Sequence, residues 1–449
     1  MPSAAVTRSK TGPAAASPTT APAPRALVLL PLLSTLGGFA VHIFAVHLAP
    51  RNQLKLWFQK TVAELAAEIK MSNAWPAVLR GVGASTDPNA RGAVKTLLVL
   101  LAFFRDMLST QLARGFLWLL AVASMPLLLH ILLESVKTGR AAILTPLNII
   151  IVSSIGQVFC LGGATNIISV PSHAYARYLQ IKQANDALNA SKKDDDAGTA
   201  VTLEQVVHPI PSASFFKVQA AALFSGLAML TIALSIHLDP KRLPQEWIAA
   251  NVAFQFFPIF FLPLLLPLFG APAAKKITPA PPAGTAVVPR LDAARMYQLV
   301  SLLTVPLWWF GLYLAAAPLS TKITKCLSVI RSIGGYIKAI HFIRTAGIRV
   351  AINVAFPLSH GEWLLIWDLV GILIALVSVV WIDQAADQWA YDLFANRVPG
   401  YRRPHEKRFL LEDLIVGLPS ALLLGPGFAG ARYFQRREIL AEKVRLLHE

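Results

Sequence analysis

The stretch ALVLLPLLSTLGGFAVHIFAVHL, residues 26–48, decides the fold class, because it carries no Asp, Glu, Lys or Arg. A helix of about 20 apolar residues is long enough to cross a hydrocarbon core of about 30 Å. Backbone polar groups must be satisfied internally in lipid, and a run this long and continuous is typical of a helix rather than of a barrel strand. Residues 26–48 are therefore predicted to span a membrane.

Seven further apolar runs repeat this pattern, and the whole composition agrees with it. The chain is 55% hydrophobic and only 14% charged, whereas soluble domains carry about 25% charged residues. The sequence predicts an all-α, polytopic transmembrane helical bundle of about eight spans in a multi-pass protein of the endoplasmic reticulum membrane. The further runs lie at about 115–133, 142–168, 214–237, 247–270, 296–317, 362–382 and 410–431.

The segments outside these runs define the expected organisation of the chain. We expect a disordered tail at 1–25, a single transmembrane domain at 26–434 and a polar tail at 435–449. The start of 51–92 and the basic segment 320–352 have the pattern of amphipathic interfacial helices. Two other segments, 172–213 and 271–292, are predicted to be a solvated loop and an extended linker.

Charge and cysteine content limit the partners. The net charge is +17, but Lys and Arg occur in short blocks between apolar runs, which is typical of anchoring to anionic headgroups. The lipid bilayer, and not nucleic acid, is therefore the expected partner of these charges. Two isolated cysteines, Cys160 and Cys326, predict neither a disulfide framework nor a metal site.

Asp368 is the clearest candidate for chemistry, because an ionisable group inside a span is costly to bury and is a functional candidate by default. It lies between Trp363 and Trp381, which are about 27 Å apart along a helix and resemble two aromatic belts. An apolar environment favours the neutral carboxylic acid, which suits a proton donor. The alternative interpretation is a carboxyl that only bonds a neighbouring helix.

Glu134 is a second candidate acid, at the end of the run 115–133, with His130 one turn before it on the same face. A carboxyl beside a histidine suits a general acid or its proton relay. Lys137 and Arg140 follow directly, so an ion pair at the interface is the alternative interpretation. The pair of His130 and Glu134 also leaves an acyltransferase open.

Several amide and aromatic side chains could contact a substrate. Amides inside lipid usually bond another helix, but they could also orient a hydroxyl group in a cavity. Ring faces can stabilise a carbocation, although aromatic residues more often serve packing. The predicted contacts are Asn148, Gln157, Gln255, Trp309 and Trp367.

A different reading comes from Asp383, Asp387 and Asp392, which follow the run 362–382. Intramembrane prenyltransferases hold magnesium and diphosphate with two Asp-rich motifs. The chain has one loose cluster of this kind and no matching second motif. A magnesium-dependent prenyltransferase therefore remains an alternative, as does a transporter whose polar residues line a continuous path.

Three segments of the chain resemble the fungal transmembrane terpene cyclases of ascochlorin, ascofuranone and macrophorin-type meroterpenoid pathways. The segments are Gly156-Gln157 through Pro171 and Tyr175, His360…Trp367-Asp368, and Leu424-Gly425-Pro426-Gly427…Arg436-Arg437-Glu438. The chain departs from the family at Arg432-Tyr433-Phe434, where a Trp-containing stretch is expected.

The resemblance implies cyclisation of a farnesylated aromatic substrate without a cofactor or metal. A buried acid protonates a terminal epoxide or an alkene, and a carbocation then closes the rings. With this lipophilic substrate as the partner, we expect Asp368 to be the acid and Glu134 a second acid or proton relay. Asn148 and Gln157 are the expected polar contacts.

Overall fold

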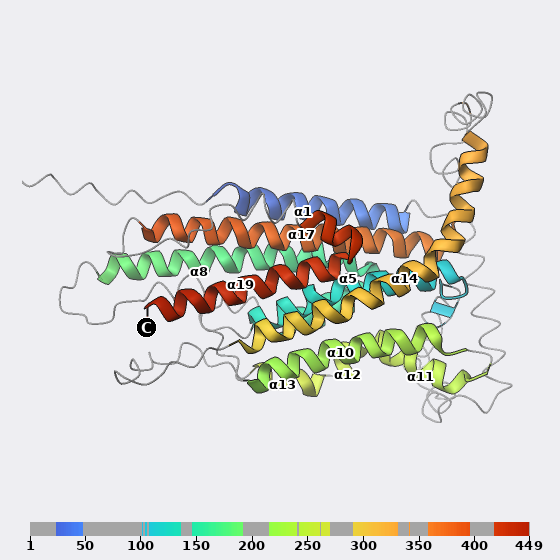
Figure 1. Ribbon diagram of the computed structural model, residues 1–449, viewed down its shortest axis with the longest axis horizontal. Helices are drawn as coiled ribbons and strands as arrows, with labels where there is room; N and C mark the ends of the chain where they lie inside the picture. Colours follow the sequence, from blue (N-terminus) through green and yellow to red (C-terminus); the bar gives the residue numbers. More distant parts are fainter. Residues whose placement is uncertain are drawn as a thin grey trace, which may run out of the picture.

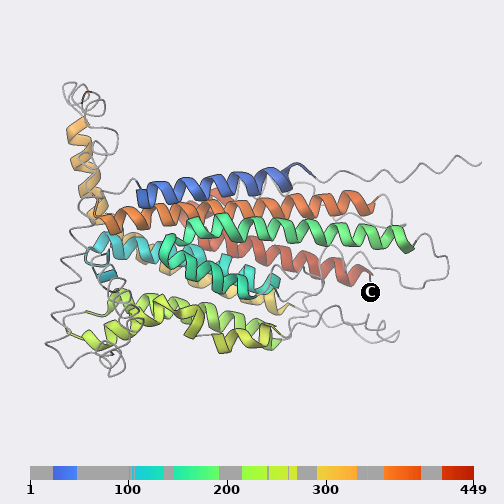
Figure 2. The same ribbon diagram turned by 180° about the vertical axis from the view of Figure 1, so that it is seen from behind.

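The computed structural model describes residues 24–47, 101, 104–105, 107–135, 146–191, 215–239, 242–260, 262–269, 291–330, 341, 358–395 and 417–448. Every regular element in these ranges is a helix, and most helices run along one common direction (Figure 1, Figure 2). The all-α fold class predicted from the sequence is confirmed for this part of the chain.

Five of the described helices are long and apolar enough to cross a membrane, which is compatible with a multi-pass membrane protein. They coincide with five of the eight predicted runs. The five helical segments are Ala26–Ala45, Gln111–Ser135, Val218–His237, Asp292–Thr324 and Gly361–Ala390.

The other three predicted runs are interrupted or only partly described. The run 142–168 divides at Cys160 into α6 (Pro146–Phe159) and α7 (Leu161–Ala164). The run at 410–431 is described from residue 417, and its helix stops before Gly425. The total of about eight spans therefore stays a prediction, as do the interfacial helices, because 51–92 and most of 320–352 lie outside the described residues.

The run 247–270 is interrupted at Phe256, where α11 (Pro244–Gln255) ends before α12 (Phe257–Phe260) begins, and α13 (Leu262–Phe269) follows. Proline has no amide hydrogen for a helical bond and clashes with the preceding turn. Pro258 lies two residues after Phe256, which accounts for the end of α11.

Helix α5 (Gln111–Ser135) occupies the centre of the bundle. It packs against α10 (Phe215–His237), α14 (Asp292–Ile330), α17 (His360–Ala395) and α19 (Pro426–His448). Nearly every residue of α5 from Leu112 to Glu134 is buried. A helix that is apolar on all sides is stable only where other helices or lipid surround it.

Two groups of helices lie on opposite sides of α5 (Figure 1, Figure 2). On one side α1 (Ala26–His42) packs against α17 and α8 (Val170–Ser191). On the other side α10 packs against α11 and α13. Helix α5 therefore lies between the two groups and contacts α17 on one side and α10 on the other.

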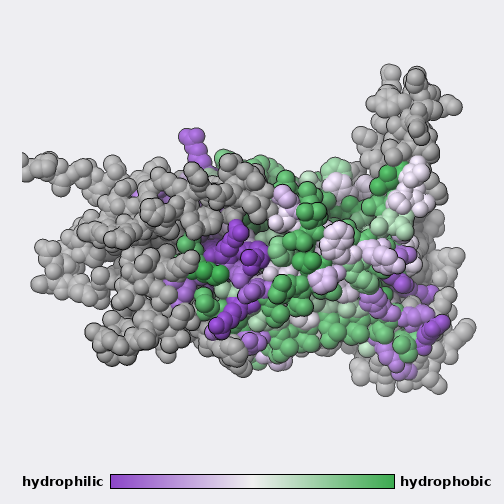
Figure 3. Space-filling view, viewed as in Figure 1, coloured by the Kyte–Doolittle hydropathy of each residue, from purple (hydrophilic) through white to green (hydrophobic). Residues whose placement is uncertain are grey.

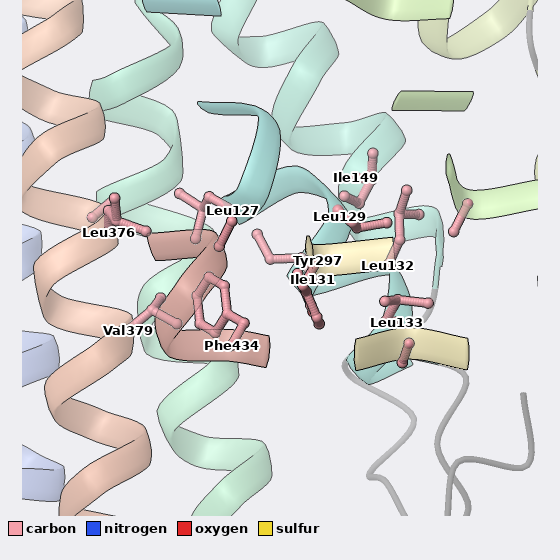
Figure 4. Packing of buried hydrophobic residues seen from close by; sticks show 14 of the residues in the cluster. Leu127, Leu129, Ile131, Leu132, Leu133, Ile149, Tyr297, Leu376, Val379 and Phe434 are labelled. Carbon is pink, nitrogen blue, oxygen red and sulfur yellow. The ribbon is translucent and has the colours of Figure 1, made fainter. Parts of the chain in front are cut away.

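Aromatic and aliphatic side chains of α14, α17 and α19 pack together in the core beside α5. Phe434 of α19 lies against Tyr297 of α14, with ring centroids 5.5 Å apart, close to Leu376 and Val379 of α17 (Figure 4). Lipid tails are as apolar as leucine, so helix association in a bilayer depends on close packing and interhelical hydrogen bonds. The large rings fix the position of α19.

The outer surface of the bundle carries an apolar band. Figure 3 shows hydrophobic residues over α14 and α10, with hydrophilic residues over α19 and around α11. Large side chains in the band are highly exposed, including Leu302 at 62% and Tyr313 at 73%. Exposed apolar area of this extent suits contact with lipid.

Glycines bring α7 and α17 into backbone contact. A Cβ added to Gly162 would lie 2.8 Å from the Cα of Gly371, so no side chain fits at this crossing. Asn166 strengthens the crossing, because its amide donates to the carbonyl oxygens of Gly162 (2.7 Å) and Gly371 (2.6 Å). Ser34 of α1 donates to the Asn166 Oδ1 at 2.6 Å. Three helices are thereby joined inside the bundle.

A capping box fixes the start of α17. The Ser359 amide donates to the Glu362 carboxylate at 2.8 Å, and the Glu362 amide donates to the Ser359 hydroxyl at 3.2 Å. This reciprocal arrangement satisfies amides that have no partner inside the helix. Lys322 and Thr110 also reach the Glu362 carboxylate, each at 2.8 Å.

The segment 172–213 was expected to be a loop, and this expectation is wrong for its first part. Helix α8 continues to Ser191 and buries His173 and Arg177 completely against neighbouring helices. The charged residues on which the expectation rested, Lys192 to Asp196, lie outside the described residues. Residues 435–448, expected as a polar tail, continue helix α19, and Arg437 and Glu438 in this segment are buried.

Candidate functional site

A cavity of about 270 Å³ lies inside the bundle between α5, α6, α10 and α17. Most of the side chains around it are apolar, and we call it the apolar cavity. Ligand pockets in proteins typically measure about 300–1,000 Å³ and combine apolar walls with a few polar groups. Three phenylalanines, Phe104, Phe254 and Phe257, contribute to its wall.

Asp368 of α17 is the one Asp, Glu, Lys, Arg or His side chain among the described residues that line the apolar cavity. Its Oδ1 accepts hydrogen bonds from the Cys160 thiol, at 2.9 Å, and from the backbone amide of Gly162. Asp368 is only 8% exposed. The structure thus holds a single carboxyl group, in a fixed orientation, at the wall of an apolar space.

The break at Cys160 explains how Asp368 is held. Cys160 has φ 83°, and among the described residues it is the one non-glycine residue with positive φ. Such a conformation costs about 1–3 kcal/mol and occurs where surrounding contacts impose it. The amides in the first turn of a helix lack acceptors inside that helix. At the start of α7, the Asp368 carboxylate supplies an acceptor for the Gly162 amide.

Two of the hydroxyl groups around the apolar cavity donate to carbonyl groups one helical turn earlier in the chain. The Thr165 hydroxyl donates to the Leu161 carbonyl at 2.7 Å, and the Ser225 hydroxyl donates to the Ala221 carbonyl at 2.9 Å. These bonds occupy the hydroxyl hydrogens and leave a largely apolar lining. Asp368 is consequently the strongest candidate for acid–base chemistry in this cavity.

The predicted amide contacts lie at different distances from this cavity. Asn148 is half-buried, and its Oδ1 accepts a 3.4 Å hydrogen bond from Ser169, which lines the cavity. Gln255 is buried next to the lining residue Phe254, but does not itself line the cavity. The side chain of Gln157 lies outside the described part of the structure.

The predicted tryptophan contacts lie away from the cavity. Trp367 stacks on Phe44 of η1 (Ile43–His47), the π-helical segment that follows α1, with centroids 4.5 Å apart, and also contacts Trp363 edge-on at 5.9 Å. Trp309 is 52% exposed on α14. Trp367 therefore serves the packing of the N-terminal helical segment against α17, whereas Trp309 lies on the outer surface of the bundle.

Glu134, the predicted second acid, belongs to a separate cluster that we call the buried polar network. Glu134 is fully buried, and its Oε1 accepts a 3.0 Å hydrogen bond from Arg437 of α19. The structure therefore pairs Glu134 with a guanidinium group rather than placing it at the apolar cavity. The network consists of His130, Glu134, His173, Arg177, Asp383, Asp387 and Arg437.

Asp383 is the centre of the buried polar network. Its Oδ1 lies 2.9 Å from His173 Nε2 and 3.4 Å from Arg177 Nε, and its Oδ2 lies 3.3 Å from His130 Nε2 and 3.2 Å from Arg437 Nη1. Asp387, one turn later, pairs with both Arg177 and Arg437. Charges buried this deeply require such partners.

Arg437 remains charged in this environment. Burial alone would lower the pKa of its guanidinium group, but the carboxylates of Asp383 and Asp387 raise that pKa above its ordinary value. The network therefore joins α5, α8, α17 and α19 through permanent charges. Asp392, the third aspartate of the predicted magnesium cluster, accepts instead from Gln388 at 3.3 Å.

The network and the apolar cavity are separate sites on one helix. Asp368 and Asp383 both belong to α17, and at a rise of 1.5 Å per residue they lie about 22 Å apart along it. The sequence identified Asp383, Asp387, His130 and Glu134 as candidates but did not show that they meet. His173 and Arg177 were not predicted as site residues. They could have been found from their spacing, because they lie four residues apart on one face of a helix, directly after an apolar run.

No protein-family model matches the chain, and the searches found no curated protein and no solved structure similar to it.

Proposed function

We propose that this chain is a membrane-embedded terpene cyclase, which closes rings in a farnesylated aromatic substrate through a carbocation. The observation that carries the proposal is a single carboxyl group, Asp368, held at the wall of an otherwise apolar cavity inside the helix bundle. Resemblance to the fungal meroterpenoid cyclases adds the substrate class and the secondary-metabolite pathway.

In the proposed reaction, Asp368 is the general acid. Its carboxylic acid transfers a proton to the oxygen of a terminal epoxide, or to an alkene carbon. The epoxide C–O bond opens to a tertiary carbocation, and the electrons of the next alkene form a new C–C bond to that cation. Loss of one proton from the final cation gives a product isomeric with the substrate, so the reaction consumes no other reactant.

Cys160 and the Gly162 amide position this acid. Both donate to Oδ1, and Oδ2 then carries the transferable proton. A fixed donor lowers the entropic cost of reaching the transition state. The donor must also be reloaded after each turnover, and the proton lost from the final cation provides an equivalent proton.

The phenylalanine rings in the wall suit the cationic intermediates. Phe104 and Phe254 meet edge to face, with centroids 5.3 Å apart, and line the cavity together with Phe257. The face of an aromatic ring attracts a cation, and an apolar wall excludes water that would trap the cation as an alcohol. Steering of the cyclisation is the role we assign to these rings.

The test is conversion of a farnesyl-phenol and of its terminal epoxide by microsomes from yeast expressing the chain. We expect a cyclic product isomeric with the epoxide, formed with or without a chelator. The variant Asp368→Asn should lower the rate by about 100-fold or more, the usual range for removing a general acid. Asp392→Asn is the matched control, because it changes a partly exposed carboxyl of the same helix that bonds Gln388.

Three other outcomes would overturn the proposal. Equal rates for Asp368→Asn and wild type would remove Asp368 as the acid. Release of diphosphate from a prenyl diphosphate, abolished by the chelator, would instead identify a prenyltransferase. Binding of both substrates without conversion, by well-folded protein, would instead favour a transporter.

A further inference from the structure

The buried polar network contains three side chains with the donor atoms that transition metals prefer. His130 of α5, His173 of α8 and Asp383 of α17 are each at most 1% exposed. One donor atom from each lies within 4.8 Å of the other two. Two imidazole nitrogens and one carboxylate oxygen form a donor set that suits zinc and neighbouring first-row divalent ions.

The spacing of these donors is close to that of a coordination shell. Asp383 oxygens lie 2.9 Å from His173 Nε2 and 3.3 Å from His130 Nε2. With metal–ligand distances of about 2.0–2.2 Å, two ligands of a tetrahedral ion are about 3.4 Å apart. Small side-chain shifts would therefore bring all three donors onto one ion.

The surroundings of His130 fit a metal ligand. Its Nδ1 lies 3.2 Å from the Tyr297 hydroxyl, and its ring stacks on Phe434 at 3.9 Å. Histidine ligands usually bond an outer partner through the nitrogen that does not face the metal. His130 Nε2 and Asp383 Oδ2 face each other at 3.3 Å, and within the described part of the chain neither has a contact of hydrogen-bond geometry, although Asp383 Oδ2 also lies 3.2 Å from Arg437 Nη1.

The charges of the buried polar network are compatible with a bound cation. Glu134, Asp383 and Asp387 supply three carboxylates, whereas Arg177 and Arg437 supply two guanidinium groups. The network thus carries one net negative charge, and a divalent ion would leave one net positive charge, so its binding changes the sign of the buried charge and not its size. The guanidinium groups do not exclude a metal, since each is also paired with other carboxylates and a carboxylate has about four lone-pair positions.

We propose that His130, His173 and Asp383 bind one divalent first-row transition metal ion of the zinc class, which links α5, α8 and α17. The site is separate from the apolar cavity and does not depend on the proposed cyclase activity. Its role is structural, because its ligands are buried and none of them lines that cavity.

The test is the metal content of the intact chain, purified in detergent with a peptide affinity tag and without a nickel column. Wild-type protein from zinc-replete yeast should retain about one equivalent of metal per chain by mass spectrometry, as a buried site holds its ion through purification. His173→Gln should lower this content to the background level. His237→Gln is the matched control, because His237 accepts from Trp118 and lies outside the network.

A cobalt titration keeps the test decisive if the His173 variant fails to fold. Metal-depleted wild type that remains monodisperse should take up Co²⁺ and show the visible absorption of a four-coordinate site, and should unfold at a higher temperature when Zn²⁺ is restored. Absence of both metal and Co²⁺ uptake in folded wild type would overturn the proposal and assign the neutralising charge to a protonated histidine. Equal metal content in wild type and His173→Gln would overturn the ligand assignment.

Discussion

The orientation of Asp368 depends on a break in the helical run at Cys160. Cys160 has a backbone conformation that non-glycine residues rarely adopt, and the break that it creates exposes the Gly162 amide to Asp368. The acid of the proposed reaction is thus oriented by a thiol and an amide that belong to another helix. This arrangement allows the contribution of the thiol to be measured separately from that of the acid.

Replacement of Cys160 by alanine should lower the cyclisation rate by about tenfold, because one hydrogen bond to a charged or polar group contributes about 1–2 kcal/mol. Cys160→Ser keeps a donor and should retain most of the activity. The initial rates of both variants in microsomes check this prediction. A greater loss in the serine variant than in the alanine variant would contradict the hydrogen-bonding role of the thiol.

Removal of one charge from the buried polar network should be far more damaging than removal of a surface charge. Arg437→Leu leaves Glu134, Asp383 and Asp387 without their common partner, and we expect a loss of about 3–5 kcal/mol in the free energy of unfolding. Arg436→Leu is the control, because Arg436 is exposed on the same helix. Thermal unfolding in detergent, followed by intrinsic fluorescence, measures both. Similar melting temperatures for the two variants would show that the network contributes little.

At the scale of helices, close approach of backbones organises one side of the bundle. The crossing of α7 with α17 at Gly162 and Gly371 has no space for a side chain, and Asn166 donates to both glycine carbonyl groups. The hydrogen bond between Asp368 and the Gly162 amide lies at the same crossing. The stability of this helix pair and the orientation of the acid therefore depend on the same contact.

Gly371→Ala should destabilise the protein by about 1–3 kcal/mol, because the added methyl group overpacks the crossing. Gly226→Ala provides the opposite case, since nothing lies within 4 Å of a Cβ at that helical position. There, alanine should stabilise the helix by up to about 1 kcal/mol. Melting temperatures in detergent compare the two variants. A neutral Gly371→Ala would indicate that the two helices can move apart.

The helices also show what could be inferred from the sequence. The runs that became α5, α10 and α17 were predictable, because uninterrupted apolar stretches of this length have few alternatives to a spanning helix. The break at Cys160 was not predicted: Gly162 and Gly163 follow it, but glycine is frequent in transmembrane helices and does not by itself locate a break. The helix at 172–191 was missed because its polar residues are satisfied by distant partners, as in the pair of His173 with Asp383.

The candidate site was predictable to a similar extent. Asp368 was identifiable from the cost of an acid inside an apolar run, and the structure places it at a cavity. The pairing of Glu134 with Arg437 joins residues far apart in the chain, and no local pattern encodes such a pair. Composition likewise could not reveal that Trp309 faces outward while Phe104 and Phe254 line the cavity.

At the scale of the whole molecule, the bundle has an apolar outer surface as well as an apolar core, and it buries one network of charged side chains. Apolar residues of α1, α10 and α14 face outward, whereas charged side chains of four helices meet inside. Five helices are long and apolar enough to span a bilayer. This distribution predicts that the chain is stable only in lipid or detergent.

Alkaline carbonate treatment of microsomes checks this prediction. The protein should stay in the membrane pellet, because spanning helices resist extraction that removes proteins bound by charge alone. A peripheral protein from the same membranes serves as the control and should enter the supernatant. Release of the chain together with this control would mean that its basic residues, rather than its apolar helices, hold it to the membrane.

The position of Arg437 in α19 has a consequence for how the protein is made. During synthesis, Glu134, Asp383 and Asp387 enter the nascent bundle before the ribosome has added the guanidinium group that pairs with all three. Until Arg437 is added, Arg177 is the one guanidinium group among the described residues of the network, facing three carboxylates. Assembly of the network is therefore completed by α19, after α5, α8 and α17 have been synthesised.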